Sequence, residues 1–377
     1  MNFDQKPDRA SSYAYKWEKY KDTNILPCWI ADTEFRCAQP ILDALLKRTE
    51  HGLLGYTLPK HHRGALQAIK HWCKKRYDWE IETNWIVWTP GVVPAFNMAS
   101  KAFSKQNEGI IVQTPNYPPL LAAPRINERE QLCVPTVLEN GRWTLDFDAL
   151  EQHASKPTTH LFIMCNPMNP AGSVMTRAEL DRVADICNRH DISICSDEIH
   201  CDLILDELEH VPASKHPALE QHSVTLMAAS KTFNVAGLGT SFAIIPNPKL
   251  RSAFVNAGAG IVPWVNVMGL EATEAAFTQC DKWYDAQLAY LRANRDYLVK
   301  AINQIPGLSC TAPEATFLLW VDASGLGIEN TQKWCEARGV GPSPGADFGQ
   351  AHCFRINFGC ARSYLEEIVA RLSGEAV

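Results

Sequence analysis

The sequence predicts an α/β protein with two domains: a large domain whose mostly parallel sheet is covered by helices, and a smaller α+β domain. Short apolar segments alternate with amphipathic stretches from about residue 85 to residue 245, which is typical of strands joined by crossover helices. The pattern changes after about Gln279, where one long amphipathic stretch precedes further strands. A length of 377 residues agrees with two domains of ordinary size.

The expected strands of the large domain are apolar on both faces, as buried parallel strands are. They cover residues 85–88, 109–113, 160–165, 192–196, 223–228 and 241–245. A helix should begin after Thr176, because Thr176 and Glu179 have the spacing of a capping box before a periodic apolar segment. In the small domain we expect a long helix from about 279 to 304, strands at 316–321 and 352–358, and a last helix from about Ser363.

Composition excludes several classes of protein. A net charge of −6 offers no broad basic surface, so we expect no nucleic-acid partner. No apolar segment approaches the roughly 18 residues needed to cross a membrane. The 13 cysteines are an odd number without a Cys-x-x-Cys pair, and the N-terminal residues contain no apolar signal core. We therefore expect reduced thiols, no metal site and a cytoplasmic protein.

Distinctive motifs follow four of the expected strands, at the sheet edge where open α/β folds bind ligands. Residues 89–94 bring Gly91 to the start of a helix, where free N–H groups and the helix dipole favour an anion such as phosphate. An ordinary strand-to-helix turn is the alternative. Residues 165–172 contain two Asn-Pro pairs, which force an extended loop that directs the amide of Asn169 into the crevice, unless the loop is only rigid.

The other two motifs supply a carboxylate and an amine. Asp197 leaves a buried strand, where an anion is costly unless it meets a cation, although the residue equally fits a helix cap. Lys231 lies among small and apolar residues, where desolvation lowers the pKa of a lysine and makes it a nucleophile; a solvated loop lysine is the alternative. Together the four motifs match the phosphate, ring nitrogen and aldehyde of pyridoxal 5′-phosphate.

Over essentially its whole length the sequence resembles the fold-type I pyridoxal-phosphate enzymes of the class I/II aminotransferase superfamily. Within that superfamily it is similar to the cystathionine β-lyase (C–S lyase) branch of the MalY/PatB type. The motifs that carry the resemblance are residues 26–35, 55–57, 165–170, 196–200, 230–234 and 354–358. We therefore expect a three-layer, aminotransferase-like large domain at residues 45–275, a small domain at 276–377, and an N-terminal segment, 1–44, that joins the small domain.

The resemblance implies a role for each matched residue. Lys231 would bind the cofactor as a Schiff base and shuttle protons, and Asp197 would pair with the ring nitrogen. Asn169 would donate to the phenolic oxygen, with His200 nearby. The other expected cofactor contacts are the backbone of Gly91, Val92 and Val93, the hydroxyl of Ser230, the ring of Tyr117, and Tyr56 of the neighbouring subunit in a homodimer with shared active sites.

Substrate contacts are implied in the same way. Arg355 would hold the α-carboxylate of a small amino-acid substrate with its fork of donors; a structural ion pair is the alternative. Ile30 and Ala31 would lie near the substrate side chain. Tyr117 also has an alternative role, as the anchor of a Pro-Pro turn. Gly239 departs from aspartate-type aminotransferases, which have a phosphate-binding arginine there, and this departure favours the lyase branch.

These features predict a lyase that eliminates the thiol of a cysteine thioether and leaves pyruvate and ammonia. An aminotransferase would use the same residues up to the loss of the α-proton, so it is the first alternative. A pyridoxal-phosphate-binding regulator that acts through protein contacts is the second. A nicotinamide dehydrogenase is not supported, because residues 258–263 lack the third glycine of the fingerprint.

Overall fold

The computed structural model describes residues 1–8 and 12–374. Its main feature is an eight-stranded sheet in the order β2-β9-β8-β7-β6-β3-β4-β5. The strands are β2 (Ile86–Thr89), β3 (Gly109–Thr114), β4 (Glu130–Glu139), β5 (Arg142–Leu145), β6 (Thr159–Cys165), β7 (Ser193–Asp197), β8 (Ser223–Met227) and β9 (Ser241–Ile244). Neighbours from β4 through β3, β6 and β7 to β8 are parallel, whereas β9 is antiparallel to both β8 and β2 and β5 is antiparallel to β4. The predicted mostly parallel sheet is therefore confirmed.

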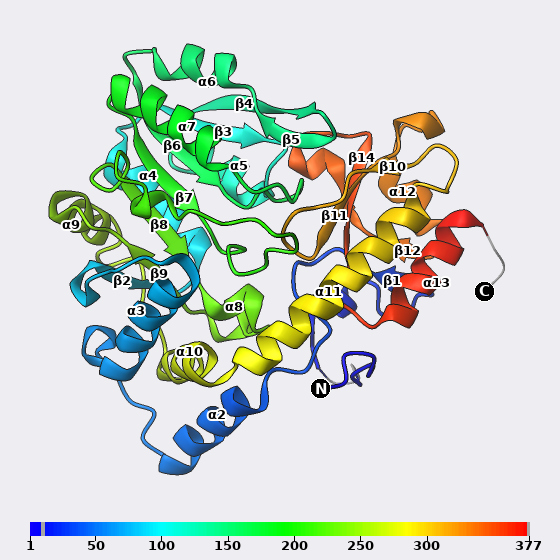
Figure 1. Ribbon diagram of the computed structural model, residues 1–377, viewed down its shortest axis with the longest axis horizontal. Coiled ribbons are helices and arrows are strands. Elements are labelled where there is room, and N and C mark those ends of the chain that lie inside the picture. The colour runs from blue at the N-terminus through cyan, green and yellow to red at the C-terminus, as the bar shows by residue number, and fades with distance from the viewer. Residues whose placement is uncertain (9–11, 375–377) are drawn as a thin grey trace.

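Helices cover both faces of this sheet (Figure 1). One face packs against α4 (Val92–Phe103), α5 (Pro118–Ile126) and α9 (Pro248–Ala257). The other packs against α6 (Phe147–Ala154), α7 (Arg177–Arg189), α3 (Arg63–Tyr77), α8 (Ala229–Thr232) and α10 (Val267–Gln279). Neighbouring strand residues alternate between the two faces: Ile110 belongs to the first cluster and Ile111 to the second. The result is the predicted three-layer α/β architecture.

Helix α7 begins where the sequence predicts it. The Thr176 hydroxyl accepts a hydrogen bond from the Glu179 backbone N–H (3.2 Å), and the Glu179 carboxylate accepts one from the Thr176 N–H (2.7 Å). These reciprocal bonds satisfy two backbone donors that the first turn of a helix would otherwise leave unpaired. Buried Leu180, Val183 and Cys187 then face the sheet, as the periodicity predicts.

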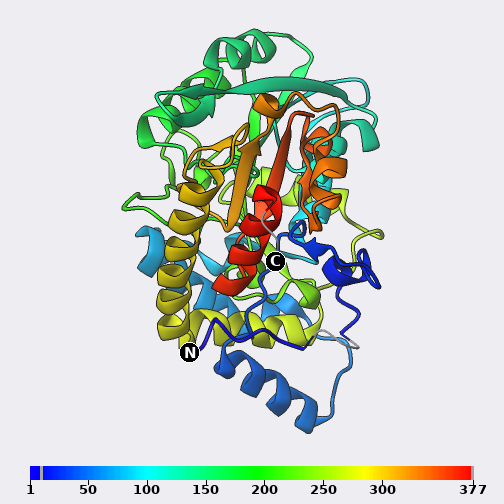
Figure 2. The same ribbon diagram turned by 90° about the vertical axis from the view of Figure 1, so that its right-hand side faces the viewer.

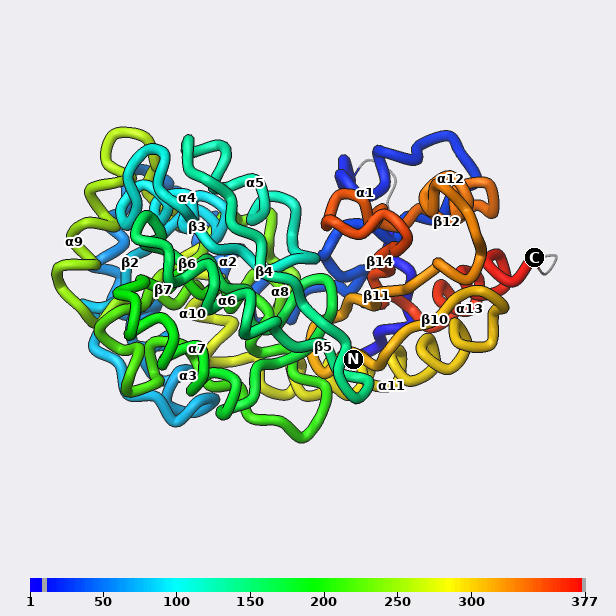
Figure 3. The backbone as a smooth tube through the Cα atoms, turned by 90° about the horizontal axis from the view of Figure 1, so that it is seen from above, coloured from blue at the N-terminus to red at the C-terminus, as the bar shows by residue number. Residues whose placement is uncertain are grey.

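A second, four-stranded antiparallel sheet has the order β10-β11-β14-β13. Its strands are β10 (Ser309–Cys310), β11 (Leu318–Asp322), β13 (Ser343–Pro344) and β14 (Cys353–Asn357). The helices α11 (Asp281–Ile302), α12 (Thr331–Glu336) and α13 (Arg362–Ser373) accompany it. In Figure 3 these elements form one side of the molecule and the large sheet forms the other. The domain limits at residues 44 and 275 remain a prediction.

The N-terminal segment lies beside the second sheet rather than beside the first (Figure 2). It contains α1 (Tyr15–Glu18) and β1 (Leu26–Pro27), and β1 pairs in parallel with β12 (Val340–Gly341). After β1 the chain crosses to α2 (Gln39–His51), which projects at the bottom of Figures 1 and 2. Residues 28–35, between β1 and α2, thereby run past the carboxyl edge of the large sheet, and we call them the strap.

One apolar core extends through both parts of the molecule. The long helix α11 contributes Leu291, Leu298 and Ile302 to a cluster that also contains Trp72 of α3 and Phe354 of β14. This continuity restricts large rearrangements of one part against the other, because buried apolar contacts would have to separate. Among the described residues, no helix has both the length and the hydropathy that a membrane-spanning helix requires.

The 13 cysteines all lie within the described residues and are free thiols. Burial raises the pKa of Cys187 to about 12, and it also raises the pKa of Cys165 and Cys195 above the usual range. Buried thiols of this kind are protonated and inert, so these side chains act as small apolar core residues, as expected. The cytoplasmic location that the cysteine count suggested stays a prediction.

Candidate active site

A cavity of about 800 Å³ opens at the carboxyl edge of the large sheet, between that sheet, the strap and β14. Segments that follow β2, β3, β6, β7 and β8 converge there, as the topology of an open parallel sheet requires. The predicted site residues that line this cavity are Ile30, Ala31, Gly91, Val92, Val93, Tyr117, Asn169, Asp197, His200, Ser230, Lys231 and Arg355. The predicted site residues, which are distant from one another in the sequence, therefore line one cavity.

Lys231 lies in the short helix α8, directly after β8. Its Nζ donates a hydrogen bond to the backbone oxygen of Ala31 in the strap (2.6 Å). Burial lowers the pKa of Lys231 to about 8, and the positive charge of Arg355 acts in the same direction. The amine therefore loses its proton at a much lower pH than a solvated lysine does, which is what a nucleophile or proton acceptor requires.

Asp197 ends β7 on the floor of the cavity and is buried. One carboxylate oxygen accepts a hydrogen bond from the Ile199 N–H (3.2 Å), and no ion pair among the described residues includes Asp197. Burial raises the pKa of this carboxyl group to about 6, although the positive charge of Lys231 opposes the shift. Because burial makes the ionised form of Asp197 unfavourable, this carboxylate is suited to bind a cationic group of a ligand, which would stabilise its charge.

His200 lies three residues further on and is also buried. Its Nδ1 has no hydrogen-bond partner among the described residues. Burial, with the charges of Lys231 and Arg355, holds the pKa of His200 well below its usual value, so the imidazole is neutral. A neutral imidazole with a free ring nitrogen can bind a polar ligand atom without adding charge to the site.

Arg355 enters the cavity from β14, on the side opposite the sheet. Its guanidinium donates to the Asn169 side-chain oxygen (2.8 Å) and to the Trp29 backbone oxygen (2.6 Å). The guanidinium also lies over the ring of Phe348, at 4.7 Å from the centroid. The Nε is buried and has no partner among the described residues, so a donor remains for a ligand carboxylate. The structural ion pair considered as the alternative role is absent from the described residues.

The start of helix α4 forms one wall of the cavity. Gly91 precedes the helix with φ 150° and ψ 159°, a conformation that is essentially restricted to glycine. The first N–H groups of the helix, at Val92 and Val93, have no partner within the helix because an α-helix leaves its first donors unpaired. This arrangement is an anion seat, and Ser230 places a hydroxyl-bearing residue in the same wall.

Tyr117 caps the helix α5 and is half-buried in the cavity wall. Burial raises the pKa of its phenol, and the charges of Asp197 and Arg355 act on it in opposite directions. The Tyr117 ring is therefore close enough to Asp197 and Arg355 for both charges to act on its phenol. This position agrees with stacking on a ligand ring and also with anchoring of the Pro-Pro turn.

Tyr56 is the one predicted site residue that the structure does not bring to this cavity. Its side chain is fully exposed, at 102% of its reference area. It lines a separate open pocket of about 910 Å³ together with residues 260–268, including Trp264. Within a single chain Tyr56 therefore contacts none of the other candidate residues.

Several cavity residues were not predicted. Tyr15 and Lys19 come from the N-terminal segment, and Gln332 and Asp347 from the C-terminal part of the chain. No sequence motif marks them, because their position depends on the pairing of β1 with β12 rather than on a strand end. Among the described residues one group could also hold a cation: ligand atoms of Asp322, His352 and Cys353 lie within 4.8 Å of one another. Asp322 already accepts a hydrogen bond from the Ser324 N–H (2.7 Å).

Known proteins share both the sequence and the fold. The family model "Aminotransferase class I and II" matches residues 29–372. The chain is 33% identical to the cystathionine beta-lyase PatB of Bacillus subtilis (strain 168), with 99% of both chains aligned. It is 32% identical to the protein MalY of Escherichia coli (strain K12), over 99% of this chain and 98% of MalY.

Solved structures agree. A crystal structure of OvoB has 44% sequence identity and a TM-score of 0.96, over 99% of this chain and 98% of that one. The structure of cystalysin from Treponema denticola, described as containing a pyridoxal 5′-phosphate cofactor, has 29% identity and a TM-score of 0.95 over the same shares. The three-layer fold, the strand-end cavity and these similarities lead to one conclusion: the chain belongs to the class I and II aminotransferase family, in the group that includes PatB and MalY.

Proposed function

We propose that this protein is a pyridoxal-phosphate-dependent carbon–sulfur lyase that cleaves cysteine thioethers by β-elimination to a thiol, pyruvate and ammonia. The observation that carries the proposal is the convergence of Lys231, Asp197 and Arg355 on one cavity, with the pKa of Lys231 lowered to about 8. The names of PatB, described as a cystathionine beta-lyase, and of the C–S lyase from Staphylococcus hominis support the same reaction.

The cavity fits pyridoxal phosphate on three observations. The anion seat at Gly91, Val92 and Val93 suits a phosphate group. The buried carboxylate of Asp197 forms no ion pair with the residues that the structure describes, and it suits a protonated ring nitrogen. The free Nδ1 of His200 leaves a polar position nearby. Lys231 would bind the aldehyde carbon, Asn169 the phenolic oxygen and Tyr117 the face of the ring.

When bound, pyridoxal phosphate supplies the electron sink that stabilises a negative charge on the α-carbon of an amino acid. The protein's own residues do the rest. Arg355 holds the α-carboxylate with its free donors, including Nε, which orients the bond from the α-carbon to its hydrogen. The Lys231 amine, a free base above about pH 8, takes that proton. The carbon–sulfur bond then breaks, the thiolate leaves, and water converts the remaining fragment to pyruvate and ammonia.

A direct assay tests this function. The purified protein, supplied with the cofactor, should release stoichiometric pyruvate and thiol from L-cystathionine, with no requirement for a 2-oxo acid. An aminotransferase would instead need the 2-oxo acid and would form a new amino acid. The absence of pyruvate together with transfer of the amino group would replace the lyase by its first alternative.

We expect the substitution Asp197→Asn to stabilise the cofactor-free protein but to weaken its binding of pyridoxal phosphate. The pKa of Asp197 lies near 6 in the folded chain and near 3.8 when unfolded, so the folded state loses stability as the pH rises through this range. Without cofactor, the variant should therefore be more stable at pH 8 by about 2–3 kcal/mol, and this advantage should vanish below about pH 4. The variant should also bind pyridoxal phosphate more weakly, because the ring nitrogen loses its anion.

Thermal unfolding of cofactor-free and cofactor-loaded protein at several pH values checks both effects. The substitution Asn188→Asp, on the exposed surface of α7, is a control for a change between the two side chains outside the cavity. If Asp197→Asn destabilised the cofactor-free protein at pH 8, a structural role for this carboxylate would be indicated instead.

The proposal includes a homodimer in which Tyr56 contacts the cofactor phosphate bound by the neighbouring subunit. Its support is the open pocket around Tyr56, where large apolar side chains are exposed on the isolated chain. These are Leu53, Leu54, Ile261 and Trp264, with exposed fractions between 57% and 70%. A second copy of the chain would cover this surface. Single exposed apolar side chains are normal on a protein surface, but a group of large ones around one pocket indicates a binding surface.

Tyr56→Phe should weaken cofactor binding by about tenfold without changing the thermal stability of the cofactor-free chain, since the hydroxyl of an exposed side chain contacts nothing within its own subunit. Equilibrium dialysis of pyridoxal phosphate measures the affinity, and sedimentation gives the mass. Tyr13→Phe, at another exposed tyrosine, is the matched control. A fully active monomer, or a dimer with unchanged affinity in the Tyr56 variant, would contradict the shared site.

A further inference from the structure

The strap binds both cationic side chains of the cavity through its backbone. Lys231 donates to the Ala31 oxygen (2.6 Å), and Arg355 donates to the Trp29 oxygen (2.6 Å). Any displacement of the strap therefore changes the position of the amine and of the guanidinium together. The residues that fix the strap thus determine the geometry of the cavity, although they lie outside its polar floor.

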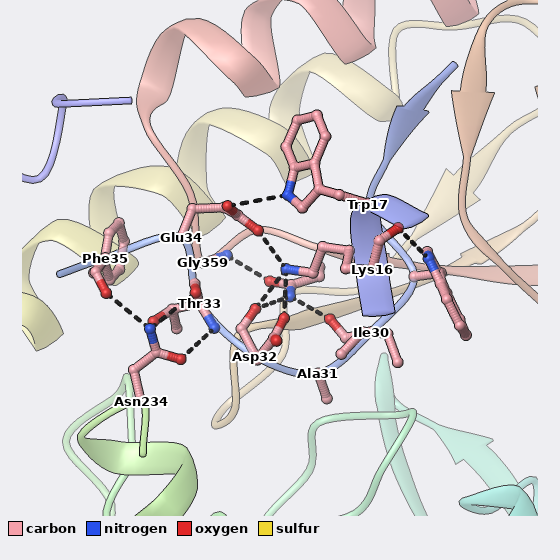
Figure 4. A network of polar contacts seen from close by, with 12 residues as sticks. Lys16, Trp17, Ile30, Ala31, Asp32, Thr33, Glu34, Phe35, Asn234 and Gly359 are labelled. Atoms are coloured by element: carbon pink, nitrogen blue, oxygen red, sulfur yellow. Dashed lines mark hydrogen bonds and ion pairs between the residues drawn. The ribbon is translucent and has the colours of Figure 1, made fainter. Parts of the chain in front are cut away.

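A buried lysine fixes the strap from the side away from the large sheet. Lys16 of α1 is only 3% exposed, and Figure 4 shows its amine between Asp32 and Glu34. The Nζ lies 2.7 Å from the Asp32 backbone oxygen, 2.7 Å from the Asp32 carboxylate and 2.8 Å from the Glu34 carboxylate. The ammonium group donates hydrogen bonds to the Asp32 backbone oxygen and to the Glu34 carboxylate, and it forms an ion pair with the Asp32 carboxylate. Burial of this charge is tolerated because two carboxylates neutralise it.

Two asparagines hold the same stretch from other directions. The Asn357 amide of β14 donates to the Asp32 oxygen (2.6 Å) and also to the Ile30 oxygen (2.5 Å). Asn234, three residues after Lys231, accepts from the Thr33 N–H (3.2 Å) and donates to the Thr33 oxygen (3.0 Å). The backbone on each side of Asp32 is therefore fixed, and the direction of its carboxylate depends on Lys16 (Figure 4).

Four charged groups act on the Lys231 amine besides burial. Asp32 and Asp197 attract its positive charge, whereas Arg355 and Lys16 repel it. Among these charges Asp32 has the largest influence, ahead of Asp197, which the sequence motif had indicated. The ion pair between Lys16 and Asp32 thus connects helix α1 of the N-terminal segment to the charge of the reactive amine.

We propose that Lys16 and Asp32 are positioning residues for Lys231: the buried ammonium of Lys16 pairs with the Asp32 carboxylate, offsets the attraction of that carboxylate for the reactive amine, and fixes the strap carbonyl to which the amine donates. The inference rests on the proposed function only in taking Lys231 as the reactive lysine. Neither residue is assigned a contact with the substrate or with the reacting atoms. Their effect is on the pH at which the amine becomes a free base.

The test measures the Lys231 amine itself in the full-length chain prepared without cofactor. Acetylation of Lys231 by acetic anhydride is followed by peptide mass spectrometry from about pH 6 to about pH 10, because only the free base reacts. The midpoint is expected near pH 8 in the unchanged chain. Asp32→Asn removes the attracting carboxylate, so its midpoint should fall by at least about half a pH unit.

Lys16→Met should shift the midpoint in the opposite direction. It removes a repelling charge and leaves Asp32 without its partner, so the midpoint should rise, by at least about half a pH unit. The conservative variant Lys16→Arg should restore the midpoint of the unchanged chain. Glu34→Gln is the matched control: it removes a carboxylate from the same lysine, but Glu34 is not among the groups that act on Lys231. Its midpoint should stay within about 0.2 units.

A general destabilisation of the fold would shift the acetylation midpoint of Lys231 in the same direction in Asp32→Asn and in Lys16→Met. Shifts in opposite directions therefore cannot arise from destabilisation. Equal midpoints in Asp32→Asn and the unchanged chain, or shifts of one sign in both variants, would overturn the inference. Asp32→Asn keeps the shape of a side chain that is 39% exposed, so this arm remains decisive if Lys16→Met does not fold. Because acetylation does not require turnover, a protein that releases no pyruvate but shows the opposite shifts would refute the proposed function alone.

Discussion

Replacement of Lys231 by alanine should reduce pyruvate release from L-cystathionine by at least about 10³-fold, because proton transfer by a positioned base alone contributes about 10²- to 10⁴-fold. Lys231 lies in α8, just after β8, and its amine reaches the strap at Ala31. Within the described residues, the other lysine that lines the cavity is Lys19, which lies over the ring of Trp29 at 4.7 Å. No second amine is therefore placed to take over the α-proton.

The variant should still bind pyridoxal phosphate, because the anion seat at Gly91 and the carboxylate of Asp197 are unchanged. Its cofactor should, however, be removed by dialysis, since the variant cannot form the proposed covalent bond to Lys231. Activity and cofactor content are measured on the same preparation, with Lys300→Ala on the exposed face of α11 as the control. Full activity in the Lys231 variant would require a different mechanism.

The second large effect is expected at Arg355. Arg355→Lys keeps a positive charge but removes the two-pronged donor, and kcat/KM should fall by about 10²-fold, equivalent to about 3 kcal/mol for the loss of charge-assisted hydrogen bonds. Most of the loss should appear in KM, because the carboxylate is bound in the ground state as well as in the transition state. Steady-state kinetics with a cysteine thioether measure both constants.

A substrate comparison separates this role from a structural one. Arg355 also holds Asn169 and the strap, so a structural defect would lower activity toward every substrate. A thioether of cysteamine, which lacks the α-carboxylate, should bind equally weakly to the unchanged protein and to Arg355→Lys. Arg338→Lys, which alters a guanidinium over the ring of Trp334, is the control outside the cavity. A loss of binding for both substrates would assign Arg355 to the structure of the site.

The strands of the large sheet were predictable from the sequence where both faces of a strand are buried. Strands such as β6 and β8 are buried on both faces, and this produces the continuous apolar segments that the sequence displays. The hairpin of β4 and the edge strand β5 was not predicted, because β4 alternates between buried and exposed residues and contains Pro135. A signal existed in Asn140 and Gly141, which both have positive φ, as a tight hairpin turn requires.

The polar floor of the cavity was predictable for a different reason. Asp197 ends β7, and Asn169 and Lys231 lie in the segments that follow β6 and β8, so their position in the sequence determines which edge of the sheet they reach. Lys16 had no such relation to a strand and lies among aromatic and charged residues that suggest a solvated surface. Its burial results from long-range pairing, which periodicity in a short window does not report.

The pairing of β1 with β12 has a consequence for biosynthesis. Leu26 lies opposite Val340, so the strap cannot reach its final position until almost the whole chain has left the ribosome. Contacts of such large sequence separation form late, because closing a long loop costs conformational entropy before the contact stabilises it. We therefore expect a chain that ends before β12 to retain the large sheet but to lack an ordered strap. Such a nascent chain would carry its reactive lysine without the strap carbonyl to which that amine donates, which makes completion of synthesis a condition for activity.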